Sequence, residues 1–240
     1  MDKVCRVFAL FLFACCATAA SAQEKTGIKQ GFELKPGTAR ILLLEPSVRV
    51  GAQSTGGLFE PNADWTAQSK QNIERELVAI QGRLGNAIDR HELDATDSSA
   101  DLRRYHALFG AVADSVIEYQ FFPGNRLPSK KKDKRLFEWS VGPGLRALPA
   151  LDGYDYILVI RTKDAFGSTG RKLLQFAAAM GGIGVQSGEH VGMAGLIDVR
   201  SGDLVWLNAD LKMGGDVRTA EGANKRVRQL LEGFPGRGAE

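Results

Sequence analysis

The sequence predicts a single α/β domain built on a mixed sheet of about four or more strands and flanked by about five helices. Three observations support this class. Two short segments, 40–46 and 154–162, have the continuous apolar centre of strands covered on both faces. Segments of helical periodicity separate them, which favours parallel neighbouring strands. A hairpin pattern over 191–211 adds an antiparallel pair and makes the sheet mixed.

The amino terminus has the three parts of a secretory signal peptide. A short positive start precedes an unbroken apolar run over 7–14, and Ala20 and Ala22 fit the small-x-small cleavage pattern before Gln23. The apolar run is shorter than the roughly 20 residues that a membrane span needs. We therefore expect residues 1–22 to be removed and the mature protein to be periplasmic or secreted, without a transmembrane segment.

Processing at a cysteine is the alternative that this region leaves open. Residues 12–15 loosely match the lipobox of bacterial lipoproteins, in which Cys15 would be lipidated, although Phe13 stands where a small or β-branched residue is usual. That outcome would anchor the protein in the outer membrane. The 3 cysteines of the chain all precede Gln23. Cleavage after Ala22 would therefore leave the mature chain without a cysteine for a disulfide, a catalytic thiol or a metal site.

Behind the signal peptide, the sequence divides into a lead-in, one domain and a tail. Residues 23–38 are polar and contain several glycines, which predicts a flexible lead-in. Residues 39–235 are expected to form one α/β domain, because no internal repeat divides them, and 236–240 form the tail. Within the domain, the buried strand over 40–46 precedes a glycine-rich loop over 47–62.

Apolar residues at three-and-four spacing predict two helices after this loop. The first is expected to begin near the N-cap Asp64 and to end near Gly85. The second covers about 100–121 and follows a polar connection over 86–98, whose end at 97–99 is a further capping signal. The buried stripes are Ile73, Leu77, Ile80 and Leu84 in the first helix, and Leu102, Tyr105, Phe109, Val112, Val116 and Tyr119 in the second.

The densest charge run of the chain is Lys130 to Arg135, with one aspartate inside it. Such a run is typical either of a contact with anionic lipid or an acidic partner, or of a solvated loop. We predict the solvated loop. The elements that follow it are a short helix over 136–148, the strand over 154–162, a helix over 169–180 that glycines at 181–184 end, and a final helix over 217–231.

The clearest local structure is the hairpin over 191–211. Two strand-like runs flank a short turn that contains Gly202. With a two-residue turn at this glycine, Ile197 opposes Trp206, and we expect Trp206 to be largely buried.

The same stretch carries a family resemblance. Asp198, Gly202, Leu204 and Trp206 match the hairpin motif of a group of bacterial envelope proteins. The group includes the curli-secretion lipoprotein, the penicillin-binding-protein activator lipoproteins and the amino-terminal domain of the Tol-system β-propeller protein, and this chain resembles a soluble relative of them. The resemblance implies an α/β sandwich used for assembly in the cell envelope, with an envelope protein as partner and no catalytic residues. The chain departs from the group in lacking a clean lipobox.

No stretch of the sequence has a recognisable catalytic or metal-binding pattern. The 3 histidines, at His91, His106 and His190, lack the spacing of a zinc site. The glycines of 167–170 and 182–188 fit neither a serine elbow nor a nucleotide-binding loop. We therefore predict no catalytic residues, no cofactor and no metal. The scattered carboxylates that sequence alone cannot bring together include Asp94, Asp97, Asp155, Asp198 and Asp210.

The formal net charge of +3 is too small to argue for nucleic acid. The predicted function is a non-enzymatic exported protein, a periplasmic binding or assembly domain of the bacterial cell envelope. Two alternatives stay open. One is an outer-membrane lipoprotein subunit or regulator of a secretion or cell-wall machine, and the other is a hydrolase with an unrecognised carboxylate site.

Overall fold

The computed structural model describes residues 24–93, 100–122, 124–133 and 136–236. The predictions of signal-peptide cleavage between Ala22 and Gln23 and of lipidation at Cys15 lie outside these described residues. So does the capping signal at 97–99.

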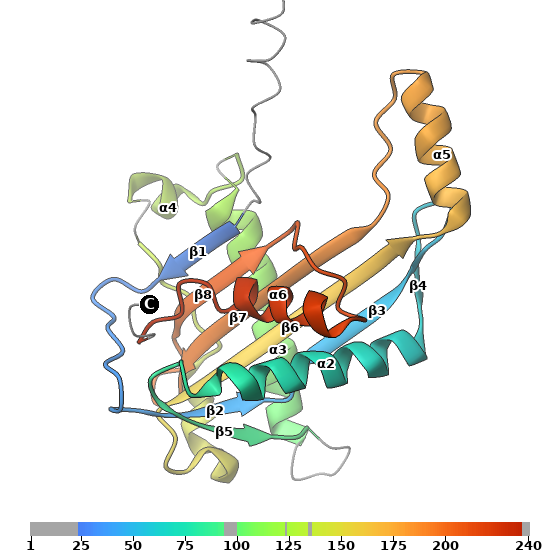
Figure 1. The fold of residues 1–240 in the computed structure, drawn as a ribbon. Helices are drawn as coiled ribbons and strands as arrows, with labels where there is room; N and C mark the ends of the chain where they lie inside the picture. The colour runs from blue at the N-terminus through green and yellow to red at the C-terminus, as the bar shows by residue number, and fades with distance from the viewer. Residues whose placement is uncertain (1–23, 94–99, 123, 134–135, 237–240) are drawn as a thin grey trace, which may run out of the picture.

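An eight-stranded mixed sheet forms the centre of the molecule (Figure 1). Its strands follow the order β1-β8-β7-β6-β2-β5, and β3 and β4 extend it beside β6. β2 is parallel to β5 and β6, and β3 is parallel to β6, whereas β6–β7, β7–β8 and β1–β8 are antiparallel pairs. The predicted α/β class with a mixed sheet is therefore confirmed. The strands are β1 (Glu24–Ile28), β2 (Arg40–Leu44), β3 (Ser47–Gln53), β4 (Phe59–Pro61), β5 (Ala87–His91), β6 (Tyr156–Gly167), β7 (Glu189–Asp198) and β8 (Leu204–Asp210).

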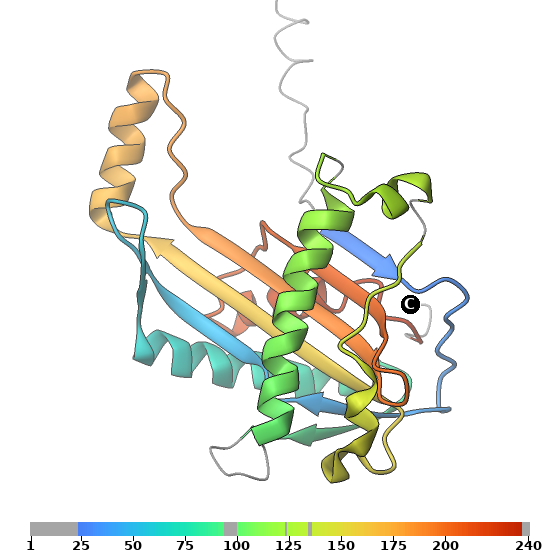
Figure 2. The same ribbon diagram turned by 180° about the vertical axis from the view of Figure 1, so that it is seen from behind.

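Helices cover both faces of the sheet. α2 and α6 pack side by side on one face, and α3 lies on the opposite face (Figures 1 and 2). The described residues contain five α-helices, which are α2 (Ala63–Gln81), α3 (Ala100–Val116), α4 (Pro128–Lys132), α5 (Thr169–Met180) and α6 (Ala220–Leu230). Three shorter turns complete the fold, namely the π-helical η2 (Ile117–Phe121) and the 3-10 turns η3 (Pro143–Ala147) and η4 (Pro149–Leu151).

β2 is continuously apolar because both of its faces are covered. Its side chains alternate between the faces of the sheet. Ile41 and Leu43 join the core under α2 and α6, whereas Leu42 and Leu44 join the core under α3. All four are buried. The prediction of a strand covered on both faces is confirmed for β2, and β6 has the same alternation.

Three segments predicted as polar connections contain strands. Part of the flexible lead-in predicted over 23–38 is β1, which pairs with β8 at one edge of the sheet. The loop predicted over 47–62 contains the β3–β4 hairpin, and the connection over 86–98 contains β5 at the other edge. These predictions are wrong because edge and hairpin strands expose one side to water and lack a continuous apolar run.

Two helix predictions also change. The first predicted helix is capped by Asn62, whose side-chain oxygen accepts the backbone N–H of Trp65 at 2.8 Å, and not by Asp64. The short helix predicted over 136–148 is reduced to η3, because Gly142 takes a left-handed φ of 87° directly before the turn. Before it, the described part of the predicted segment forms only an isolated β-bridge, between Ser140 and Asp203.

The predicted hairpin forms, but its register differs from the expected one. Leu196 opposes Trp206, and Ile197 opposes Leu204, with a β-bulge between Leu196 and Ile197. The bulge places Ile197 and Trp206 on opposite faces of the sheet, so they do not pair. Trp206 is nevertheless fully buried, as predicted, and packs edge-to-face on Phe234 at 5.4 Å between ring centroids.

Candidate functional site

Residues 168–188 leave the sheet as an arm between β6 and β7. Helix α5 runs outward from the end of β6, and the chain returns beside it to β7, so that the arm projects beyond the rest of the molecule (Figures 1 and 2). No residue of α5 is buried. In contrast, α2, α3 and α6 each bury five residues. The helix predicted over 169–180 is thus confirmed, but it is not part of the core.

The exposed side chains of the arm are large and apolar. Leu173, Phe176 and Met180 are 64%, 68% and 78% exposed, and their i, i+3, i+7 spacing forms the stripe that usually faces a core. Leu174 and Ile183 are 41% and 63% exposed. Large apolar side chains exposed together mark an interaction site on a folded protein.

Both ends of α5 are capped within the arm. At the base, Ser168 Oγ accepts the backbone N–H of Arg171 at 3.2 Å. At the tip, the backbone N–H groups of Gly182 and Ile183 donate to carbonyls of the last helical turn at 3.0 and 2.9 Å, and Gly182 takes a left-handed φ of 74°. This is the Schellman arrangement, which satisfies carbonyl groups at the helix end and fixes the shape of the tip.

The β3–β4 hairpin holds the base of the arm. The guanidinium of Arg171 donates to the carbonyl oxygen of Gln186 at 2.9 Å and to that of Thr55 at 3.2 Å. Gln53, at the end of β3, accepts the backbone N–H of Gly188 on its side-chain oxygen at 2.8 Å. Both the outgoing and the returning chain are therefore bonded to the same hairpin.

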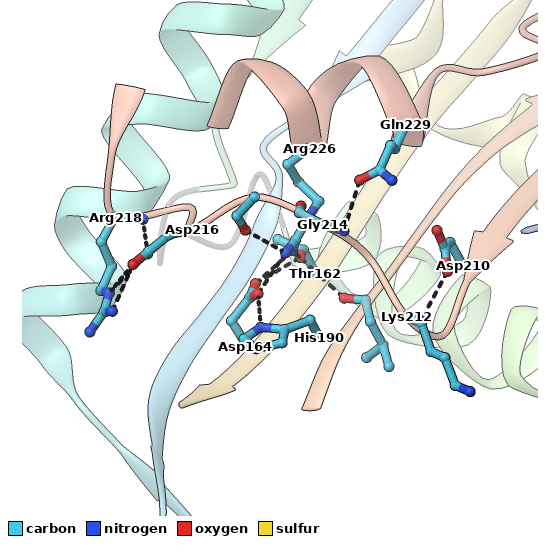
Figure 3. Close-up of polar contacts among 12 residues, drawn as sticks. Thr162, Asp164, His190, Asp210, Lys212, Gly214, Asp216, Arg218, Arg226 and Gln229 are labelled. Carbon is cyan, nitrogen blue, oxygen red and sulfur yellow. Dashed lines mark hydrogen bonds and ion pairs between the residues drawn. The ribbon is translucent and has the colours of Figure 1, made fainter. Parts of the chain in front are cut away.

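A buried charge network lies where β6 and β7 approach the arm (Figure 3). Asp164 of β6 accepts two hydrogen bonds, both 2.7 Å long, from the Arg226 guanidinium of α6. Arg226 also donates to Thr162 Oγ1 at 2.6 Å, and His190 of β7 contacts Asp164 through Nδ1 at 2.7 Å. Asp164 and Arg226 have no exposed surface, so they form a buried two-pronged ion pair.

The network anchors three elements to one another. Burial alone would raise the pKa of Asp164, but the hydrogen bonds from His190 and Arg226 outweigh it and hold that pKa below its usual value. Both carboxylate oxygens are thus occupied by cationic or ring N–H partners, which makes Asp164 a poor proton acceptor. Among the described residues, Asp164 is the only side chain hydrogen-bonded to the His190 ring.

A second ion pair packs against the end of β6. Arg218 binds Asp216 at 2.7 Å, and its guanidinium carbon lies 3.7 Å from the ring centroid of Phe166 and 4.6 Å from that of Trp65. Phe166 also packs edge-to-face on His190 at 5.0 Å. The last residues of β6 before the arm are therefore fixed by packing as well as by hydrogen bonds.

The hairpin residues that the sequence singled out lie at the opposite end of β7 from the arm. Asp198 Oδ1 accepts the backbone N–H of Ser201 at 2.8 Å within the turn. Gly202 takes a φ of 75°, and a Cβ there would lie 1.9 Å from a carbonyl oxygen of the adjoining loop. Leu204 and Trp206 are fully buried. These residues build the turn and the core.

Two of the scattered carboxylates come together. Asp155 and Asp198 line an open pocket of about 310 Å³ with Arg146 and Arg200. Asp155 accepts the backbone N–H of Arg40 at 2.9 Å, so both carboxylates hold local backbone in place. Within the described ranges, no group of three or more His, Cys, Asp and Glu side chains is placed to hold a metal ion.

The 3 histidines stay apart in the fold, and only His190 belongs to the network. His106 lies on α3, where burial, helped by the charge of Arg161, lowers its pKa to about 4. His91 ends β5 at the edge of the sheet.

The cationic run does not form a wholly solvated loop. Lys130 to Lys132 belong to α4, and Lys130 is buried, with its ammonium 5.5 Å from the ring centroid of Trp139. The prediction is wrong for Lys130 because its side chain packs beside Trp139 and its ammonium donates to the backbone carbonyl oxygen of Glu138 at 3.4 Å. Lys131 and Lys132 are exposed, and the run's last two residues lie outside the described part of the chain.

Sequence reasoning missed both the arm surface and the network. The signal for the arm was present, because residues 168–188 combine an apolar helical stripe with Arg171 and Lys172 and contain no acidic residue. The network had no sequence signal, since Asp164 and Arg226 are separated by 62 residues.

Comparison with known proteins identifies no relative by sequence. No family model matches the chain, and no curated protein is similar to it. Among solved structures, a PelC dodecamer from Paraburkholderia phytofirmans that carries a point substitution is 14% identical with a TM-score of 0.35, covering 87% of this chain and 95% of that one. A second PelC dodecamer from the same organism is 14% identical with a TM-score of 0.32, covering 87% and 96%. Separately, no helix within the described residues has both the length and the apolarity to cross a bilayer.

Proposed function

We propose that this chain is a non-enzymatic exported binding domain of the bacterial cell envelope, and that the arm is its contact element. The observation that carries the proposal is that α5 has 12 residues and none of them is buried, although its stripe of Leu173, Phe176 and Met180 is apolar. Keeping such side chains in water is unfavourable, which favours a partner that covers them. Export rests on the signal-peptide pattern of residues 1–22.

The rest of the fold supports a binding role for the arm. The arm is fixed at its base by Arg171 and Gln53, and the Asp164–Arg226 pair ties β6 to α6 beneath it. A contact element that is already ordered loses less conformational entropy when its partner binds.

Site-specific photo-crosslinking in the native host tests the proposal. A photoreactive residue at position 176 is expected to give an adduct with protein or lipid of the envelope. The matched control is position 78, because Val78 is 51% exposed on α2, away from the arm. Equal labelling at the two positions, or none at 176, would contradict the proposal.

A further inference from the structure

The apolar side chains of the arm are not confined to one side. Leu173, Phe176 and Met180 form one stripe, Leu174 lies about 100° around the helix from Leu173, and Ile183 is on the returning chain. All five are at least 41% exposed. A rigid protein surface covers one side of a projecting helix, whereas a fluid apolar phase surrounds it. The distribution therefore fits insertion into lipid better than docking on a flat protein face.

The tip is suited to an apolar phase in its backbone as well. Unpaired backbone polar groups are costly where water is absent, so an exposed helix end normally opposes insertion. Here the N–H groups of Gly182 and Ile183 already bond to carbonyls of the last turn. The tip thus presents apolar side chains with part of its backbone polarity satisfied internally.

The charge of the arm is one-sided. From Ser168 to Gly188 the chain contains Arg171 and Lys172 but no aspartate or glutamate. Both cations lie in the first turn of α5, at its base. From Lys172 to Met180 the helix rises about 12 Å, close to the roughly 5–10 Å depth to which amphipathic helices enter the headgroup and acyl boundary. With the tip among acyl chains, the two cations lie near the level of the lipid phosphates.

We infer that the arm docks on the surface of an anionic phospholipid bilayer, with its tip among the acyl chains and its basal cations against the phosphate groups. The inference rests on the proposed function and names the partner of the same surface. The docking is shallow and does not cross the membrane.

Vesicle flotation with the mature chain tests the inference. The protein is expected to float with vesicles of equal phosphatidylglycerol and phosphatidylcholine, and at least tenfold less with phosphatidylcholine alone. Combined Phe176→Gln and Met180→Gln substitutions should reduce binding at least tenfold. Lys172→Gln should weaken binding to the anionic vesicles but not to vesicles of phosphatidylcholine alone. Added salt should likewise weaken only the binding to anionic vesicles, because it screens the charges. The control Val78→Gln, on α2, should bind like the unsubstituted protein.

Depth of insertion gives a second measurement. In a Phe176→Trp variant, fluorescence from the new tryptophan should be quenched by lipids brominated in their acyl chains, relative to the background of the 3 native tryptophans. Failure of the protein to float, or equal flotation of the tip variant, overturns the inference. The inference is also overturned if the protein binds no vesicles and the tip substitutions change its oligomeric mass, because a second copy of the chain then occupies the arm. A protein-only adduct at position 176 overturns the lipid partner but leaves the proposed function standing, whereas no adduct and no flotation overturn both.

Discussion

The two ends of the β6–β7 strand pair are built in opposite ways. At one end, β7 turns tightly into β8, and Leu204 and Trp206 are fully buried. At the other end, the pair opens into an arm whose helix buries no residue. Between them lies the buried pair of Asp164 and Arg226. The difference shows where the tertiary packing stops: side chains are enclosed up to the end of β6, where Ala165 is buried and Phe166 packs on Trp65, whereas the apolar side chains of the arm stay in water. Four predictions test this contrast.

The largest loss of stability is expected at the hairpin end. Trp206→Ala removes a fully buried ring that packs on Phe234, and the cavity should cost about 3–5 kcal/mol of the free energy of unfolding. Urea unfolding followed by circular dichroism measures this. A loss below about 1 kcal/mol would mean that the hairpin end contributes no more than an exposed surface does.

A smaller loss is expected at the base of the arm. Asp164→Asn leaves the Arg226 guanidinium buried without its carboxylate, and should cost about 3 kcal/mol, at the lower end for a broken buried pair because one side-chain oxygen remains. Adding Arg226→Met should recover part of this loss, since both charges are then gone. A double variant that loses the sum of the two single effects would contradict the coupling.

The sequence was sufficient where structure depends on neighbouring residues. Asp198 and Gly202 form the turn within five positions of one another, and the continuous apolar run of β2 signals burial on both faces. The register failed because four residues, and not two, separate Asp198 from Asp203, whose backbones are hydrogen-bonded across the turn. This longer turn shifts the pairing by two residues, and the bulge between Leu196 and Ile197 shifts it back by one. A pattern of like residues reveals neither feature.

Sequence reasoning was insufficient where structure depends on distant residues or on a partner. Asp164 and Arg226 meet only because α6 folds back over β6, 62 positions along the chain. The helix over 169–180 was predicted correctly, and Leu173, Phe176 and Met180 form an apolar stripe along it. The same stripe is typical of a buried helix, so periodicity alone does not distinguish a helix covered by its own chain from one left open for another molecule.

Acid should weaken the anchored base selectively. The folded-state pKa of Asp164 is lowered, so its contribution to stability is fully present above its unfolded pKa of about 3.9 and is lost as the pH falls through the folded value. The stability difference between the unsubstituted protein and Asp164→Asn should therefore shrink as the pH falls below about 4. Urea titrations at each pH measure the difference. If the difference in the free energy of unfolding grows below about pH 4, the direction assigned to the pKa shift of Asp164 is wrong.

The smallest effect on stability is expected in the arm, and it separates the two regions most sharply. Leu173→Gln and Phe176→Gln replace side chains that are 64% and 68% exposed, and glutamine is a good helix former, so neither burial nor helix propensity changes much. Together they should shift the free energy of unfolding by less than about 0.5 kcal/mol, while Val78→Gln on α2 serves as the matched exposed control. A loss above about 1 kcal/mol would mean that the stripe packs against its own chain in solution. In that case the apolar surface serves the fold rather than a partner, and the contrast between the two ends of β6 and β7 disappears.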